Sequence, residues 1–127
     1  MKRLAWTVIA VFAACMGLCA AAQWGLNAIL DEAHEMTTEV FVAMEEDGPE
    51  TAKELLVELA SLWDERAGMM ELLCDHDDIH EVKERIIQAR ICVDYTDLEE
   101  FYSAVALVGE GIEHIRDKEG LKSANLL

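Results

Sequence analysis

The chain of 127 residues carries 26 acidic and 10 basic side chains, so its formal net charge is −16. A surface this acidic is repelled by nucleic acid and by anionic lipid headgroups, and we therefore expect no nucleic-acid partner. The length allows one small domain and no second one of ordinary size.

An uncharged run over residues 4–22 is the first element of the chain, and Lys2 and Arg3 precede it. As a helix with a rise of about 1.5 Å per residue, this run extends roughly 28 Å, which is close to the hydrocarbon thickness of a bilayer. Trp6 and Trp24 lie near its two ends, where indole rings favour the membrane–water interfaces. We therefore expect residues 4–22 to form a transmembrane helix and the membrane to be a partner of the chain.

The basic residues predict the orientation of this helix. No Lys or Arg follows the run until Lys53, and basic residues favour the cytoplasmic side of a membrane. We expect a signal anchor over residues 1–23 with a cytoplasmic N-terminus, and an acidic extracytoplasmic helical domain over residues 24–127, in the cell membrane. The alternative is cleavage near Ala22, where small residues fit a signal-peptidase site, and secretion of the domain. The uncharged run is longer than a typical signal-peptide core, which favours the anchor.

Beyond the run, apolar residues recur every three or four positions, which is typical of amphipathic helices. The first stripe starts at Leu26 and continues the preceding helix. It ends at Asp47-Gly48-Pro49, where the only proline of the chain predicts a turn. A second helix follows from about Glu50, and Gly68 weakens it by about 1 kcal/mol relative to alanine.

Two capping patterns predict the remaining helices. A third helix is expected from Asp78, which precedes Glu81 by three residues, and a fourth from Thr96, which precedes Glu99 by three. No alternating strand pattern occurs in the sequence, so we predict an all-α fold: an N-terminal transmembrane helix followed by a small antiparallel helical bundle. The residues expected in its core are Leu26, Leu30, Ala33, Met36, Val40, Met44, Ala52, Leu56, Leu59, Trp63, Met70, Leu73, Ile79, Val82, Ile86, Ala89, Val93, Leu98, Phe101, Val105, Val108, Ile112 and Ile115.

The four cysteines do not form the pattern of a disulfide scaffold. Cys15 and Cys19 lie inside the uncharged run. Cys74 and Cys92 are too far apart to bridge if one helix holds both, because the Cα atoms of a disulfide approach within roughly 7 Å. A turn over residues 75–77 that folds the chain back would leave this pairing open.

One stretch carries metal-coordinating chemistry. His76 and His80 are four residues apart, which places both imidazoles on one face of a helix, and Asp77 and Glu84 offer carboxylate oxygens. Such a set suits zinc or another divalent transition metal. The alternative is a turn with acidic capping residues, which are common at helix N-termini, and with histidines that bind nothing.

The sequence contains no catalytic signature. The serines Ser61, Ser103 and Ser123 do not lie in a strand–turn–helix pattern, and no glycine-rich phosphate-binding loop occurs. We therefore expect that the protein is not an enzyme and that it needs no cofactor, the metal above excepted.

The C-terminal half resembles a known family. The residues that carry the resemblance are Asp75-His76-x-Asp78-Ile79, Ile112-Glu113-His114-Ile115, the ending Glu119-x-Leu121-x-x-x-Asn125-Leu126-Leu127, Leu59-x-x-x-Trp63 and the Met-Lys-Arg-Leu start. Through these residues the chain resembles the domain-of-unknown-function family numbered 4363, which occurs mainly in spore-forming and related Gram-positive bacteria. The resemblance implies one N-terminal span and a helical domain outside it, and it implies no activity. Lys122-Ser123 and the glycines Gly109 and Gly111, which interrupt the last helix, depart from the family pattern.

Three functional hypotheses follow. The first is a membrane-tethered, extracytoplasmic protein-interaction or accessory module of another envelope protein. The second is a divalent-metal-binding domain centred on His76 and His80. The third is a structural envelope protein that associates with itself through Ala13, Gly17 and Ala21, whose small side chains let two spans approach closely.

Overall fold

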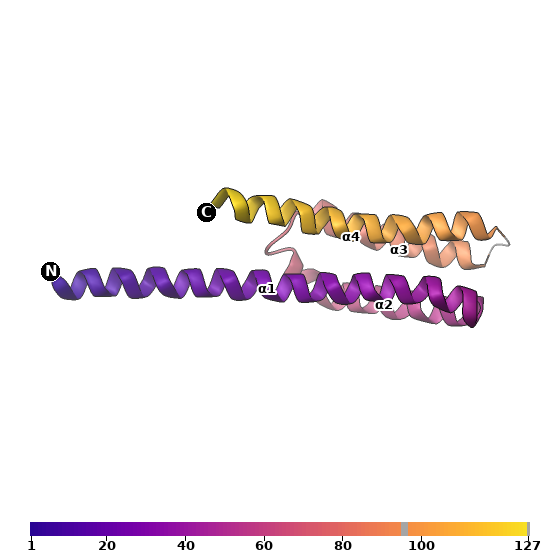
Figure 1. Ribbon diagram of the computed structural model, residues 1–127, viewed down its shortest axis with the longest axis horizontal. Helices are drawn as coiled ribbons and strands as arrows, with labels where there is room; N and C mark the ends of the chain where they lie inside the picture. The colour runs from indigo at the N-terminus through magenta and orange to yellow at the C-terminus, as the bar shows by residue number, and fades with distance from the viewer. Residues whose placement is uncertain (95–96, 127) are drawn as a thin grey trace.

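The computed structural model describes residues 1–94 and 97–126, and no strand occurs in them. Four helices make up the fold: α1 (Lys2–Glu46), α2 (Pro49–Met70), α3 (His76–Val93) and α4 (Leu98–Leu126) (Figure 1). The predicted all-α class is therefore confirmed.

The helices form an up-and-down bundle. Each helix packs against its neighbours in the sequence, and α4 returns to pack against α1, whereas no Cα atoms of the diagonal pairs lie within 8 Å among the described residues. This is the antiparallel four-helix arrangement that short connections favour. Only the second half of α1 belongs to the bundle. The first half projects from one end of it as a bare helix, so that the bundle and the N-terminus lie far apart (Figure 1).

The α1 helix is continuous from the projecting segment into the bundle. Every residue from Met1 to Ala21 is exposed, and Leu26 is the first buried residue. No turn or break separates the two halves, as expected from the stripe that continues the uncharged run. The predicted boundary at residue 23 therefore falls within a helix, about one turn before the packed core begins.

The turn between α1 and α2 is placed as predicted. Gly48 has a φ of 100°, a left-handed backbone conformation that side chains with a Cβ rarely adopt. Pro49 then occupies the first turn of α2, where its missing N–H costs nothing. The backbone N–H groups of Asp47 and Gly48 both donate to the carbonyl of Ala43, at 2.8 Å each, which satisfies the end of α1.

The core contains nearly all of the predicted residues. Trp63 and Phe101 are the largest fully buried side chains. Met36, Met44 and Leu73 are partly buried and pack against the core. The prediction for Leu98 is wrong: its side chain is 55% exposed because it is the first residue of α4 and lies at the end of the bundle.

The start of α3 also differs from the prediction. The helix begins at His76, and no side chain caps it at Asp75. Asp78 is the third residue of the helix and not its N-cap, and its carboxylate accepts a hydrogen bond from Nζ of Lys118 on α4, at 2.9 Å. Since that contact is between helices, the local capping pattern did not reveal it.

At the start of α4, the predicted capping residue Thr96 lies outside the described residues. The carboxylate of Asp97 accepts a hydrogen bond from the backbone N–H of Glu100 at 3.3 Å, which is the interaction that an N-cap makes.

The glycines of α4 do not interrupt it. At Gly111 the helix approaches α3 so closely that a Cβ atom would lie 3.0 Å from Cγ2 of Val82. Next to it, Nη1 of Arg85 donates to the carbonyl of Leu107 at 2.8 Å. Gly111 therefore permits the closest packing of α3 against α4.

The cysteines are all free thiols. Cys74 precedes α3 and Cys92 lies near its end, so the two are separated by the length of that helix. The pairing that the sequence left open is therefore excluded.

Candidate functional site

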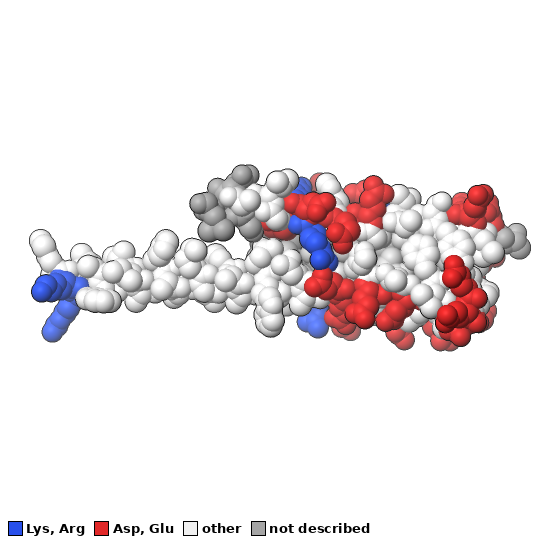
Figure 2. Space-filling model, in the orientation of Figure 1, with Lys and Arg blue, Asp and Glu red and all other residues white. Residues whose placement is uncertain are grey.

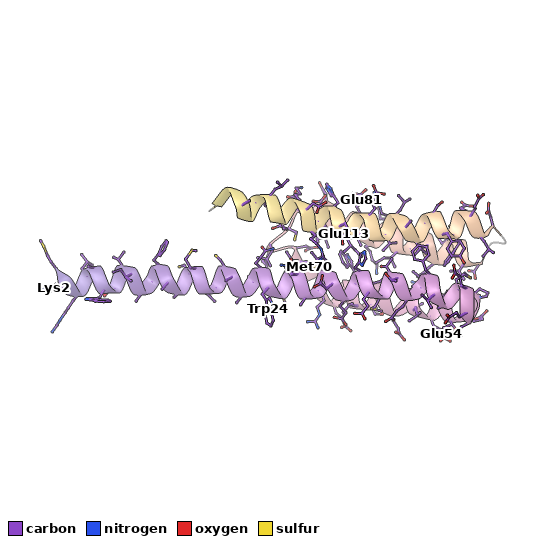
Figure 3. The ribbon with its side chains drawn as sticks, viewed as in Figure 1. Lys2, Trp24, Glu54, Met70, Glu81 and Glu113 are labelled. Carbon is purple, nitrogen blue, oxygen red and sulfur yellow. The ribbon has the colours of Figure 1, made fainter. Side chains whose placement is uncertain are left out.

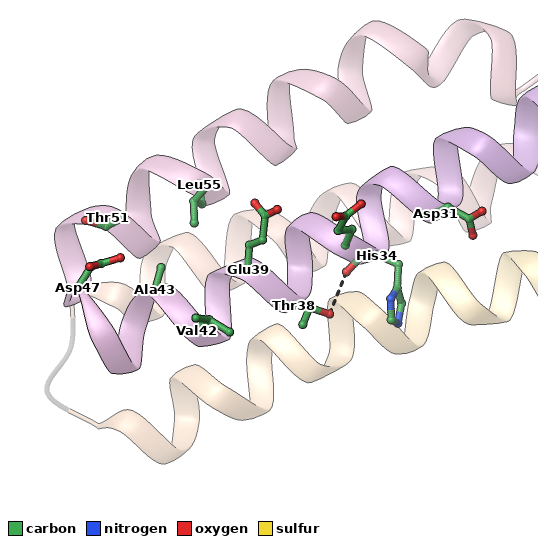
Figure 4. A pocket seen from close by; sticks show the side chains of 10 residues that line it. Asp31, His34, Thr38, Glu39, Val42, Ala43, Asp47, Thr51 and Leu55 are labelled. Carbon is green, nitrogen blue, oxygen red and sulfur yellow. Dashed lines mark hydrogen bonds between the residues drawn. The ribbon is translucent and has the colours of Figure 1, made fainter.

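A groove of about 650 Å³ runs along α1 beside the first turns of α2 (Figure 4). Most of its lining belongs to one face of α1, because side chains three and four residues apart lie in a row along a helix. The lining residues are Asp31, His34, Glu35, Thr38, Glu39, Val42, Ala43, Asp47, Thr51 and Leu55.

The groove is acidic. Asp31, Glu35 and Glu39 of α1, and Asp47 directly after it, contribute four carboxylates. Asp31 pairs with Nη2 of Arg116 at 2.6 Å. The other three carboxylates form no ion pair with any described residue, and all three residues are exposed to solvent. The groove therefore presents unneutralised negative charge.

Apolar surface lies between these carboxylates. Val42 is 46% exposed, and Leu55 of α2 is partly buried on the opposite side. The hydroxyl of Thr38 donates to the backbone carbonyl of His34 at 3.3 Å, so its proton is directed away from the groove (Figure 4). A segment with basic and apolar side chains would fit such a surface.

The residues predicted as metal ligands lie at the start of α3. The rings of His76 and His80 stack with their centroids 6.3 Å apart and their planes within 6°. Nδ1 of His76 lies 2.9 Å from a carboxylate oxygen of Glu71, and Nε2 of His80 lies 3.2 Å from one of Glu84. Both histidines are exposed.

Two of the four predicted ligands therefore lie side by side, and Glu84 contacts one of them. Asp77 forms no ion pair with a described residue. Glu71 was missed, because it lies in the turn after α2 and no helical spacing relates it to His76. Over residues 1–94 and 97–126, no three His, Cys, Asp or Glu side chains gather closely enough to hold a metal ion.

A third cluster joins α3 to α4 at the end of the bundle from which α1 projects. Nζ of Lys118 donates to the carboxylates of both Asp75 and Asp78. Nε2 of His114 lies 3.7 Å from the other oxygen of Asp78. The hydrogen bond from Lys118 holds the pKa of Asp75 below its ordinary value, and the two carboxylates in turn raise the pKa of Lys118.

Glu119 and Cys74 lie in the same region. Glu119 is only 7% exposed, and Nζ of Lys122 approaches its carboxylate at 3.2 Å. Burial, helped by the negative charge of Glu119, raises the pKa of the Cys74 thiol to about 11. Cys74 is therefore a protonated, weakly nucleophilic thiol at neutral pH.

The cluster brings together residues from two of the motifs that carry the family resemblance, one at the start of α3 and one on α4. A family model, described as a domain of unknown function, matches residues 22–126. The chain belongs to the DUF4363 family. In this DUF4363 chain, the matched region begins where α1 enters the bundle. No curated protein and no solved structure matches the chain significantly.

The projecting half of α1 precedes the DUF4363 region. It belongs to a helix that is long and apolar enough to cross a membrane, and its most apolar stretch is entirely unburied. An N-terminal signal sequence meets the same criteria. Figure 2 shows this segment as uncharged surface with Lys2 and Arg3 at its tip, whereas acidic side chains gather in several patches on the visible face of the bundle.

Proposed function

We propose that this DUF4363 protein is a membrane-anchored, extracytoplasmic helical module that binds another protein of the envelope and is not an enzyme. One observation carries the proposal: a bare apolar helix continues without a break into a packed acidic bundle. Large side chains such as Leu4, Phe12 and Leu18 are 67–72% exposed there. An apolar surface of this extent is favoured in lipid rather than in water.

The orientation follows from the charges at the two ends of the span. Lys2 and Arg3 hold the N-terminus on the cytoplasmic side. The first acids after the span, Asp31 and Glu32, belong to the bundle. Because α1 has no flexible joint, the span fixes the distance and the orientation of the bundle relative to the membrane. A partner in the same membrane would meet the same face of the bundle each time.

The surface proposed to meet that partner is the acidic groove along α1. Glu35 and Glu39 provide charge for a basic segment, and Val42, one turn further along α1, provides apolar contact. Charge complementarity of this kind accelerates association and selects among partners.

Crosslinking in cells tests the proposal. The photoreactive residue p-benzoylphenylalanine replaces Val42 in the tagged full-length chain. In the matched control it replaces Ile91, which is 46% exposed on α3. We expect one stoichiometric membrane-associated partner at position 42, crosslinked through a basic peptide, and none at position 91. The adduct should disappear when Glu35→Lys and Glu39→Lys are added. Recovery of the protein alone, or of a homodimer only, would reject the interaction module, and the homodimer would favour self-association through the span.

The anchor is tested separately. The intact mass of the chain extracted from membranes should include residues 1–22, and a C-terminal alkaline phosphatase fusion should be active. A mass that lacks these residues would show cleavage near Ala22 and secretion of the domain. An inactive fusion would reverse the proposed orientation.

The stacked pair of His76 and His80 is the basis of a second candidate function, divalent-metal binding, in which the pair supplies two ligands and no third described side chain joins them. Each histidine has one nitrogen beside a carboxylate, which leaves Nε2 of His76 and Nδ1 of His80 for a metal, and carboxylates commonly orient metal-binding histidines in this way. Calorimetry of the full chain with zinc would test it. Heat above that of buffer, lost in the variants His76→Ala and His80→Ala, is expected if the site binds zinc. No heat, or the same heat in both variants, would reject it.

A further inference from the structure

Large apolar side chains are exposed together at the end of the bundle from which α1 projects. Trp24 is 78% exposed, Leu72 is 85% exposed and Leu121 is 67% exposed. They come from three different parts of the chain: α1, the turn between α2 and α3, and the last turns of α4. Met69, at the end of α2, is 49% exposed. We call these four residues the basal apolar set.

The topology places all four residues of the basal apolar set at the end of the bundle where α1 enters it. Because α2 and α4 run antiparallel to α1, they end where α1 enters the bundle. Leu26 is the first buried residue of α1, and Glu119 is the last buried residue of α4 among the described side chains. Figure 1 shows the α2–α3 connection and the end of α4 on the side from which the N-terminal half of α1 extends, and Figure 3 labels Trp24 and Met70 at this end.

Part of the charge beside the set is paired, whereas Glu71 and Asp77 have no Lys or Arg partner among the described residues. Lys118 binds Asp75 and Asp78, and Lys122 binds Glu119. The negative charge that would repel anionic headgroups is therefore reduced at this end.

At the opposite end of the bundle, Lys53 pairs with Asp94, and four further acids have no such partner among the described residues. Glu45, Glu46, Glu99 and Glu100 are all exposed there, and none forms an ion pair with another described residue.

We propose that this end of the bundle rests on the membrane surface, with Trp24, Leu72 and Leu121 inserted among the lipid headgroups. The inference rests on the proposed membrane anchor, since the uncharged run ends at Ala22, two residues before Trp24, and so sets that residue at the outer interface. Indole and leucine side chains favour this region of a bilayer. Three points of contact, rather than one helix, then fix the tilt of the bundle and the direction in which its groove faces.

Photocrosslinking in a bilayer tests the inference. Single p-benzoylphenylalanine substitutions replace Leu72, Leu121, Leu98 and Phe12 in the full chain, which is reconstituted in nanodiscs of phosphatidylcholine and phosphatidylglycerol. Leu98 is 55% exposed at the opposite end and is the matched control, while Phe12 reports the span itself. All four side chains are exposed, so the substitutions leave the core intact. Lipid adducts are measured by intact mass.

We expect adducts at positions 12, 72 and 121, each at least tenfold above position 98. An adduct at position 12 with none above control at 72 and 121 would overturn the inference and leave the anchor in place. No adduct at position 12 would overturn the anchor and the inference with it. Crosslinks at 72 and 121 to a second copy of the chain, in place of lipid, would overturn the inference in favour of self-association.

Discussion

The indole N–H of Trp63 donates a hydrogen bond to the backbone carbonyl of Ile79, with 2.9 Å between Nε1 and the oxygen. Trp63 lies on α2 and Ile79 in the first turn of α3, and both are almost completely buried. The bond joins the two helices across the turn that separates them. It also gives the buried indole the polar partner that such a group needs.

Removal of this bond is expected to destabilise the bundle. Trp63→Phe keeps most of the packing and should lower the free energy of unfolding by about 2 kcal/mol. Trp63→Ala also leaves a cavity and should cost about 3–5 kcal/mol. Thermal unfolding of the full chain in detergent, followed by circular dichroism, measures both. Equal stability of wild type and Trp63→Phe would show that the bond contributes nothing.

Two glycines should respond to alanine in opposite directions. At Gly68, on the exposed side of α2, no atom lies within 4 Å of the position of a Cβ. Gly68→Ala should therefore stabilise the chain by about 1 kcal/mol through helix propensity. At Gly111, a Cβ would meet Val82 at 3.0 Å and Nη1 of Arg85 at 3.2 Å. The cost of overpacking there should exceed the gain in helix propensity. Gly111→Ala should therefore lower the free energy of unfolding by about 1 kcal/mol.

The two variants are compared in the same unfolding experiment, and Gly68→Ala is the control for helix propensity. If Gly111→Ala stabilised the chain as much as Gly68→Ala does, α3 and α4 would not be in close contact at Gly111.

The ion pairs of Lys118 should depend on pH in a defined direction. Because Lys118 lowers the pKa of Asp75, the carboxylate contributes stability above its ordinary pKa of 3.8, and this contribution is lost as the pH falls through the lowered value. Lys118→Met should lower the melting temperature by a few degrees at neutral pH and have little effect at about pH 2. Lys83→Met, which removes a single surface pair with Asp64, is the control and should have a smaller effect at neutral pH. If Lys118→Met lowered the melting temperature equally at both pH values, the ion pairs of Lys118 would not be the source of the lost stability.

The buried thiol of Cys74 should make the protein less stable at alkaline pH. Burial raises its pKa from 9.0 to about 11, so the folded state holds the proton more tightly than the unfolded state does. The resulting stability is complete below pH 9 and is lost as the pH rises through 11. Unfolding measured across this range should show the loss in the wild type.

Cys74→Ala provides the comparison, because lysines and tyrosines titrate in the same range in both proteins. The free energy of unfolding of Cys74→Ala should be lower than that of the wild type at pH 9. It should also fall less between pH 9 and 11. Parallel declines in the two proteins would show that Cys74 does not titrate differently in the folded state.

Most of the fold could be predicted because its signals are local. The spacing of Phe101, Val105, Val108, Ile112 and Ile115 defines one face of a helix, and all five are buried. The turn at Gly48 and Pro49 was predicted for a similar reason, since each residue has backbone preferences of its own. Leu98 fitted the same spacing but is exposed, because spacing does not show where the neighbouring helices end.

The candidate sites were predicted less well. The four-residue spacing of His76 and His80 correctly indicated that the two rings share one face. The acidic groove along α1 was not found, although its carboxylates recur at positions 31, 35, 39 and 47. A helical wheel would have placed them on one face, but the contribution of Thr51 and Leu55 depends on how α2 packs against α1.

The amino-acid sequence by itself determined the uncharged N-terminal helix, the helical class, the turn after α1 and most of the core, because each of these depends on residues within a few positions of one another. The tertiary structure alone decided that Lys118 binds Asp75 and Asp78, that Glu119 is buried, and that Trp24, Leu72 and Leu121 lie at one end of the bundle. These residues are distant in the sequence, and only the packing of antiparallel helices brings them together.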